Sequence, residues 1–184
     1  PEYPFPAGLE DCYAVAKAVY TNRFLLNTDP EQITLIGDSA GGNFAAALSL
    51  MARDRGDFMP KRQILIYPAL SNDYSENTPY RSVVDNGTDF LLTRQKLLQY
   101  QELYQSTPED RQNPYFAPLL EDDLSNQPRT LILTAEFDPL RDEGEAYGKR
   151  LAEAGCDVEM HRIKDALHGF FALGIKYLHV SESF

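Results

Sequence analysis

The order of apolar patterns in this sequence predicts an α/β fold with a mostly parallel sheet flanked by helices. Short apolar stretches rich in β-branched residues alternate along the chain with segments of helical periodicity. The first stretch, Ile33 to Ile36, is apolar on both faces, which is typical of a buried parallel strand. Strands that alternate with helices indicate a parallel sheet with helices on both faces.

Four strands follow from this reading. They are Ile33 to Ile36, Gln63 to Tyr67, Thr130 to Thr134, and Val158 to Ile163. The first follows a turn-prone cluster and runs into Gly37, so we expect it to be buried. The last alternates apolar with polar residues, which suits the solvent-facing edge of the sheet.

Helices are expected before and between these strands. Apolar residues at spacings of three and four predict an amphipathic helix ending near Asn22: Leu9, Cys12, Tyr13, Ala16 and Val19. The others span Gly42 to Ala52, Leu91 to Tyr104, and Glu143 to Ala154. The first of these three is rich in small side chains that allow close approach to a sheet, and it stops near Gly56.

The charge balance excludes several classes of partner. The 184 residues include 17 Lys and Arg against 28 Asp and Glu, a formal net charge of −11. This acidic excess repels phosphate backbones and anionic lipid surfaces, so neither nucleic acid nor a membrane surface is an expected partner. No apolar run approaches the ~20 residues that a bilayer-spanning helix needs.

The two cysteines, Cys12 and Cys156, are too few for a disulfide framework or a multi-cysteine metal site. They suit a reducing compartment, and we expect a cytoplasmic location. The chain begins at Pro1 without an initiator Met or a secretory signal pattern, so we expect it to be a piece of a longer protein.

A long excursion separates the second and third strands. It covers roughly sixty residues, which is too many for a plain connection in a compact domain. We read residues 1–184 as a single partial domain in which residues 71–107 form a cap or lid over a pocket. The alternative is that the apolar residues here pack their own helical stripe on the core.

A candidate nucleophile lies in the stretch Gly37 to Gly41, which fits the pattern G-x-S-x-G. The pattern follows an apolar strand and precedes a helix, so Ser39 occupies a sharp turn with its hydroxyl projecting outward. The helix start places the Ala40 backbone N–H beside the atom under attack, where it can serve as an oxyanion donor. The alternative is a solvated serine at a glycine-rich helix entry.

A serine hydroxyl needs a base to remove its proton, and the chain offers three histidines. His161 lies within the expected edge strand, with its side chain packed on a sheet face, and His179 lies in the terminal segment. His168 follows the last strand, beside a glycine, at the same sheet edge as Ser39. We therefore expect His168 to be the base, the alternative being a solvated loop histidine.

The base needs an orienting acid, which should follow the third strand at that edge. Four carboxylates compete there: Glu136, Asp138, Asp142 and Glu143. Asp142, with Glu145 three positions later, predicts a capping box that opens the next helix. Pro139 holds Asp138 in extended geometry just beyond the strand, so we choose Asp138. The order Ser39, Asp138, His168 is that of α/β-hydrolases.

These motifs resemble those of the hormone-sensitive-lipase-like carboxylesterases of the α/β-hydrolase fold. The matching stretches span nearly the whole chain in family order: Pro1 to Ala7, Gly37 to Gly42, Phe90 to Arg94, Asp138 to Gly144, and His168 to Phe170. The resemblance implies cofactor-free hydrolysis of small esters, with no metal ion. It places Ser39, Asp138 and His168 on the triad positions of the family.

One departure from the family is large. The His-Gly-Gly-Gly loop that supplies most of the oxyanion hole is absent, and so are the first four strands. The resemblance then implies an open edge at the strand Ile33 to Ile36, and an unpaired apolar edge invites pairing. We expect pairing there with a separate N-terminal piece or a second chain, and poor catalysis by the chain as given.

The expected function is that of a serine carboxylesterase that acts through an acyl-enzyme. One alternative is a non-catalytic ligand-binding or scaffold protein on a hydrolase fold. Another is a hydrolase of a different acyl substrate: a peptide, a thioester or an acetylated small molecule. Asn86-Gly87-Thr88 is a formal glycosylation acceptor, which we interpret as a turn.

Overall fold

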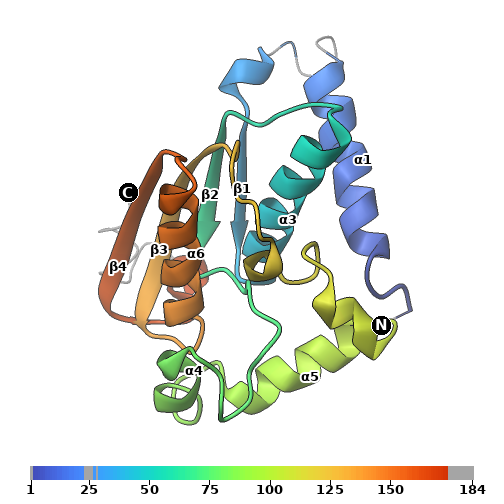
Figure 1. The fold of residues 1–184 in the computed structure, drawn as a ribbon. Helices are drawn as coiled ribbons and strands as arrows, with labels where there is room; N and C mark the ends of the chain where they lie inside the picture. Colours follow the sequence, from blue (N-terminus) through green and yellow to red (C-terminus); the bar gives the residue numbers. More distant parts are fainter. Residues whose placement is uncertain (1, 23–26, 28, 174–184) are drawn as a thin grey trace.

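The computed structural model describes residues 2–22, 27 and 29–173 (Figure 1). Its sheet contains four parallel strands in the order β1-β2-β3-β4. Their bounds are β1 Thr34–Asp38, β2 Arg62–Ile66, β3 Arg129–Phe137 and β4 Val158–Leu167. Each expected strand is present, and the predicted parallel α/β fold is confirmed. Because sequential parallel strands lie side by side, their carboxyl ends meet at one edge of the sheet.

The two outer strands of this sheet differ from its centre. Strand β4 lies at one edge and is largely exposed, as predicted, but its burial does not alternate, because residues 159–162 are all exposed. Strand β1 was expected to be buried, and for the described residues this is wrong. The Ile36 side chain is 59% exposed, because β2 is the only described strand that pairs with β1. The open edge expected at this strand is therefore present in the described sheet.

Three longer helices lie on one side of the sheet: α1 Ala7–Thr21, α3 Ala40–Arg55 and α6 Arg141–Glu153. Helices α3 and α6 pack on the same face and α1 packs on α3, so the expectation of helices on both faces is not met by the described α-helices. Helix α3 exceeds its predicted range at both ends and stops at Gly56, whose φ of 68° ends the helix in the left-handed conformation. Helix α1 ends at Thr21, with Asn22 as its C-cap, as predicted. Within the described residues, every helix is too short or too polar to cross a bilayer.

The main core lies between the sheet and helices α3 and α6. Leu65 and Ile132 of the central strands pack there against Leu50 of α3 and Tyr147 of α6. Because side chains alternate along a strand, the neighbours of Leu65 and Ile132 point to the opposite face. On that face Ile66 and Leu133 cluster with Phe170 of the short 3-10 helix η4, Phe170–Leu173.

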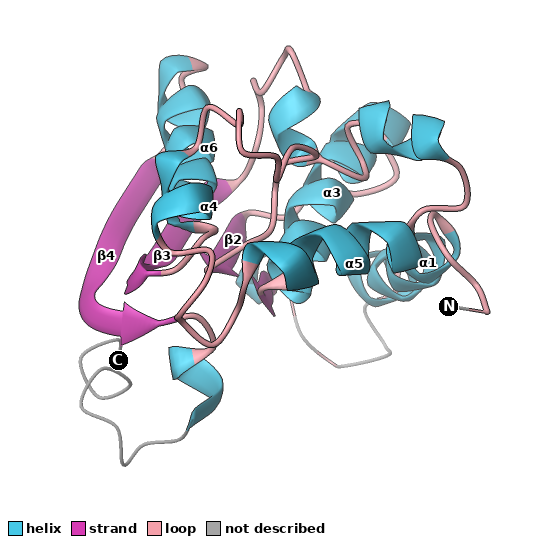
Figure 2. Ribbon diagram, turned by 90° about the horizontal axis from the view of Figure 1, so that it is seen from below, coloured by secondary structure: helices cyan, strands magenta, loops and turns pink. Residues whose placement is uncertain are grey.

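The excursion between β2 and β3 carries helices α4 Arg81–Asp85 and α5 Arg94–Tyr104. Both lie at the end of the sheet to which the strand arrows point, and Figure 2 shows them from that side. Helix α5 begins three residues later than predicted, because the Thr93 side chain accepts a hydrogen bond from the Lys96 N–H and so caps it. The 3-10 helices η2, Pro108–Gln112, and η3, Pro118–Leu120, lead back toward β3.

Candidate active site

Ser39 occupies the sharp turn between β1 and α3. Its backbone has φ 53° and ψ −117°, a combination that side-chain-bearing residues rarely adopt and that costs ~1–3 kcal/mol. The Ser39 N–H donates to the Ile66 carbonyl (2.9 Å), and the Ser39 carbonyl accepts from the Ala69 N–H (3.2 Å). The end of β2 therefore holds the turn in place and sets the position of the Ser39 hydroxyl.

Glycine at position 37 is required by the same turn. A Cβ added at Gly37 would lie 2.0 Å from the Gly41 carbonyl oxygen. Gly42 is also crowded, because its Cβ would lie 2.8 Å from that of Pro68. Gly41 is different, since the nearest atom to its added Cβ, an oxygen of Asp38, is 3.9 Å away. Two of the three glycines thus permit the close approach of strand, helix and loop.

His168 lies on the loop after β4, and its Nε2 is 2.9 Å from the Ser39 Oγ. Its ring packs on Tyr67, with centroids 4.8 Å apart. Burial, followed by the nearby Asp38 carboxylate, raises the pKa of Tyr67, so this ring stays neutral. His161 is exposed and contacts Glu159 instead of packing on the sheet. His179 lies outside the described residues.

Asp138 is fully buried just beyond β3. Its Oδ2 lies 2.7 Å from the His168 Nδ1, and its Oδ1 accepts from the Leu140 N–H (2.9 Å). With a proton on Nδ1 directed at this carboxylate, Nε2 presents its lone pair to the Ser39 hydroxyl. The structure thus brings Ser39, His168 and Asp138 into one hydrogen-bonded line.

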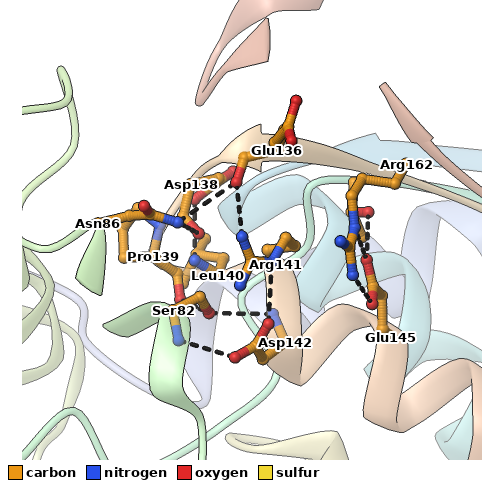
Figure 3. Close-up of polar contacts among 11 residues, drawn as sticks. Ser82, Asn86, Glu136, Asp138, Pro139, Leu140, Arg141, Asp142, Glu145 and Arg162 are labelled. Carbon is orange, nitrogen blue, oxygen red and sulfur yellow. Dashed lines mark hydrogen bonds and ion pairs between the residues drawn. The ribbon is translucent and has the colours of Figure 1, made fainter. Parts of the chain in front are cut away.

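The three competing carboxylates lie elsewhere. Glu136 Oε2 accepts from the Asp165 N–H (2.8 Å). The capping box predicted for Asp142 is wrong, because α6 begins with Leu140 as N-cap and the Asp142 Oδ2 accepts from the Ser82 N–H on α4 (2.7 Å; Figure 3). The Asp142 carboxylate therefore accepts a hydrogen bond from the excursion, whereas the sequence pattern predicted that it would cap its own helix, α6.

Glu143 is also fully buried, on the first turn of α6. Its Oε1 accepts hydrogen bonds from the Leu70 N–H (2.6 Å), the Ser71 N–H (3.1 Å) and the Tyr74 hydroxyl (3.2 Å). Burial raises the pKa of Glu143 from 4.5 to about 8, although these hydrogen bonds favour the ionised form. Glu143 thus ties α6 to the loop after β2.

Ala40 is the first residue of α3, directly after Ser39. The N–H groups of a first helical turn have no partner within the helix, and they lie at the positive end of its dipole. Its position beside Ser39 fits the oxyanion role that the sequence suggests. In the part of the chain that the structure describes, no three His, Cys, Asp or Glu side chains cluster closely enough to bind a metal ion.

An apolar pocket of about 610 Å³ lies beside Ser39 and His168. Its lining includes six leucines and tyrosines contributed by residues 91–104 of the excursion: Leu91, Leu92, Leu97, Tyr100, Leu103 and Tyr104. The excursion thus forms a wall of this pocket. Leu97 also packs into a buried cluster with Leu140. The segment therefore both lines the pocket and packs on the core.

Two site residues were not predicted from the sequence. Tyr67 follows β2 directly and packs on His168; its place at the carboxyl end of a strand was the available signal. Asn43 interrupts the small apolar residues of α3. Its side-chain nitrogen donates to the carbonyls of Ala69 and Phe116, both at 2.8 Å, so it fixes the pocket floor.

Comparison with known proteins gives a consistent result. A family model described as alpha/beta hydrolase fold matches residues 1–172. An arylesterase of Saccharolobus solfataricus is 36% identical over 170 residues, 92% of this chain and 54% of that protein. An ethyl acetate hydrolase of Pseudomonas putida is 34% identical over 175 residues, 95% of this chain and 54% of that protein.

Solved structures agree with this. An esterase of Pyrobaculum calidifontis superposes with a TM-score of 0.92 at 40% identity, over 100% of this chain and 59% of that one. The chain spans about half the length of the curated relatives it matches.

The crowding at Gly37 predicts opposite effects for two glycines of one motif. Gly37→Ala should lower the free energy of unfolding by ~2 kcal/mol or more, because the new methyl group overlaps backbone atoms. Gly41→Ala should raise it by ~0.5–1 kcal/mol, since alanine favours a helix and open space surrounds it. Urea denaturation measures both, and equal changes would contradict the description of this turn.

The raised pKa of Glu143 predicts a pH-dependent stability. Because folding raises this pKa, the stabilisation by protonated Glu143 is complete below about pH 4.5 and is lost as the pH rises to about 8. Glu143→Gln, which keeps an acceptor oxygen, should therefore flatten the fall of the free energy of unfolding across this window. Glu153→Gln, at the exposed end of the same helix, should keep the wild-type slope. An unchanged slope in Glu143→Gln would refute this.

Proposed function

Because this chain belongs to the alpha/beta hydrolase fold family, among its hormone-sensitive-lipase-like carboxylesterases, we propose that it is a serine carboxylesterase of small acyl esters. The observation that carries the proposal is the line of contacts from Ser39 through His168 to Asp138, beside an apolar pocket. Nucleophile, base and orienting acid then lie in hydrogen-bonding sequence.

In the first half of the proposed reaction, the His168 Nε2 takes the Ser39 proton as the Ser39 Oγ attacks the ester carbonyl. The carbonyl oxygen gains negative charge in the tetrahedral intermediate, and the Ala40 N–H donates to it. His168 then gives its proton to the departing alcohol, and an acyl-enzyme remains. Asp138 holds the imidazole in the required tautomer and stabilises its charged form.

Water completes the cycle by the reverse route. His168 takes a proton from water, the hydroxyl attacks the acyl carbonyl, and the Ser39 Oγ leaves with the proton that His168 returns. The buried Asp138 keeps its charge close to the imidazolium through both halves. No cofactor is needed at any step of this scheme.

The pocket supports a substrate with a small apolar part. Its aromatic and leucine lining favours burial of hydrocarbon beside the attacked carbonyl. The names of two relatives, arylesterase and ethyl acetate hydrolase, describe esters of modest size. We therefore propose small, uncharged esters as the preferred substrates.

The open edge of β1 supports a further proposal about partners. The exposed Ile36 and the unpaired β1 edge of the described sheet fit pairing with a segment supplied in the same protein or by another chain. That segment would add the remaining oxyanion donors, consistent with relatives about twice as long as this chain.

A cytoplasmic location is likewise a proposal. Cys12 and Cys156 are both free, and Cys12 is exposed to solvent, which suits a reducing compartment. Localisation of the tagged protein by cell fractionation checks it, and recovery outside the cytoplasm would oppose it.

The proposed chemistry predicts covalent labelling of one serine. A fluorophosphonate probe should modify Ser39, as located by mass spectrometry, because it is the hydroxyl activated by His168. His168→Ala and Asp138→Asn should slow labelling by at least ~100-fold. Ser125→Ala, at an exposed turn, serves as a control and should label like the wild type. A folded chain that is still not labelled at Ser39 after upstream sequence from a full-length relative has been added would favour a ligand-binding function.

The proposed pairing predicts protection of β1. Added upstream sequence from a full-length relative should slow hydrogen exchange of β1 amides and speed Ser39 labelling. Each oxyanion donor it supplies is worth ~100-fold or more in rate. A chain that stays monomeric by light scattering, with β1 amides in fast exchange after this addition, would oppose the pairing.

A further inference from the structure

A reciprocal pair of hydrogen bonds joins the excursion to the start of α6, next to the turn that carries Asp138 (Figure 3). The Ser82 N–H on α4 donates to the Asp142 Oδ2 (2.7 Å), and the Asp142 N–H on α6 donates to the Ser82 Oγ (3.0 Å). Each residue is second in its helix, where the backbone N–H has no partner within the helix. The two helices thus cap one another, and α4 cannot move without freeing both N–H groups.

The same short helix also holds the turn itself. The Ser82 hydroxyl donates to the carbonyl of Pro139 (2.8 Å), the residue after Asp138. The Asn86 side-chain nitrogen donates hydrogen bonds to the carbonyls of Glu136 and Asp138, each at 3.3 Å. Three backbone carbonyls around Asp138, those of residues 136, 138 and 139, are therefore held by α4 and its C-cap residue Asn86.

Burial makes these contacts costly to break. Ser82 and Asp138 are fully buried, and Asn86 is 7% exposed. A buried carbonyl that loses its donor is left without water to replace it, at a cost of ~1–3 kcal/mol. The Asn86 side chain is also committed to these contacts, so the folded chain offers no accessible acceptor in the formal glycosylation motif.

The geometry points to a positioning function for the Ser82–Asp142 pair: we propose that it sets where the Asp138 carboxylate meets His168. This inference rests on the proposed function only for its kinetic consequence. Its structural part, the distance between the Asp138 Oδ2 and the His168 Nδ1, stands independently. The excursion would then be a pocket wall at α5 and a brace for the acid at α4.

Loss of the pair should affect chemistry more than binding. Removing the Ser82 hydroxyl frees the Pro139 carbonyl and the Asp142 N–H, and the turn relaxes around Asp138. A shift of ~1 Å in a reacting group costs up to ~100-fold in rate, so we expect Ser82→Ala to lower kcat roughly tenfold with KM little changed.

The experiment compares four folded variants by fluorophosphonate labelling rate and by the downfield proton NMR resonance of the His168 Nδ1–H. Ser82→Ala should slow labelling roughly tenfold and shift or broaden the resonance. Asp142→Asn keeps an acceptor oxygen for the Ser82 N–H and should stay within about threefold of the wild type. Asp142→Ala removes the acceptor of the Ser82 N–H but keeps both contacts of the Ser82 hydroxyl, so its effect should fall between those of Asp142→Asn and Ser82→Ala.

Ser49→Ala is the matched control. Ser49 is as buried as Ser82, and its hydroxyl lies within hydrogen-bond distance of two acceptors, the Ala45 carbonyl (3.1 Å) and the Gln63 side-chain oxygen (2.8 Å), but on α3 away from Asp138. It should lose comparable thermal stability and keep the labelling rate and the resonance. If it slows labelling as much as Ser82→Ala, the effect is one of general stability and the proposal is overturned.

Two further outcomes are decisive. A wild-type rate and an unmoved resonance in Ser82→Ala would overturn the positioning function. If the wild-type chain is not labelled at Ser39 even with the upstream sequence added, the proposed function fails, and the resonance alone still tests the pair. Should Ser82→Ala not fold, Ser82→Cys takes its place, since it keeps the side-chain size with a much weaker hydrogen-bonding group.

Discussion

The rest of the site depends on the turn at Ser39, which the chain can make only under close constraint. Ser39 keeps a positive φ because its N–H donates to Ile66 at the end of β2 and its carbonyl accepts from Ala69 in the loop that follows. Gly37 and Gly42 allow the helix and the loop to approach this turn closely. Once this hydroxyl is fixed, the loop after β4 and the turn after β3 have to bring His168 and Asp138 to it. The precision of the site therefore lies in the loops, and the strands supply the common edge.

The excursion between β2 and β3 has two structural parts. Helix α5 lines the pocket with leucine and tyrosine side chains, several of them exposed at its mouth. Helix α4 is buried against the start of α6 through Ser82 and Asn86. A movement of the pocket wall would therefore have to leave α4 in place. The segment thus contains, in order along the chain, a helix buried against α6 and a helix that lines the pocket.

The fold could be predicted because buried parallel strands have a recognisable local sequence pattern. Ile33 to Ile36 and Thr130 to Thr134 are short, apolar and bounded by turn residues. The residues around Ser39 could be predicted for the same reason, since the strand-turn-helix order fixes their geometry. The partners of Asp142 and Glu143 could not. Both carboxylates bond to backbone N–H groups more than fifty residues away, on segments whose sequence carries no matching signal. The local pattern therefore predicted a capping box at Asp142, whose carboxylate instead contacts a distant segment. The exposure of Ile36 could not be predicted either, because it depends on which strands pair with β1.

The contact between Ser82 and Asp142 joins residues that are 60 positions apart, and that between Ser39 and His168 joins residues 129 apart. Contacts of such separation form only after the entropy of closing the intervening loop has been overcome, so they come late in folding. The helices and the strand pairs β1–β2 and β3–β4, whose paired residues are about 28 positions apart, can form before Asp138 meets His168. Partial unfolding should accordingly erase the alignment of the three side chains while most of the secondary structure persists. A folding intermediate of this chain would have the circular dichroism of an α/β protein and no contact between Ser39 and His168.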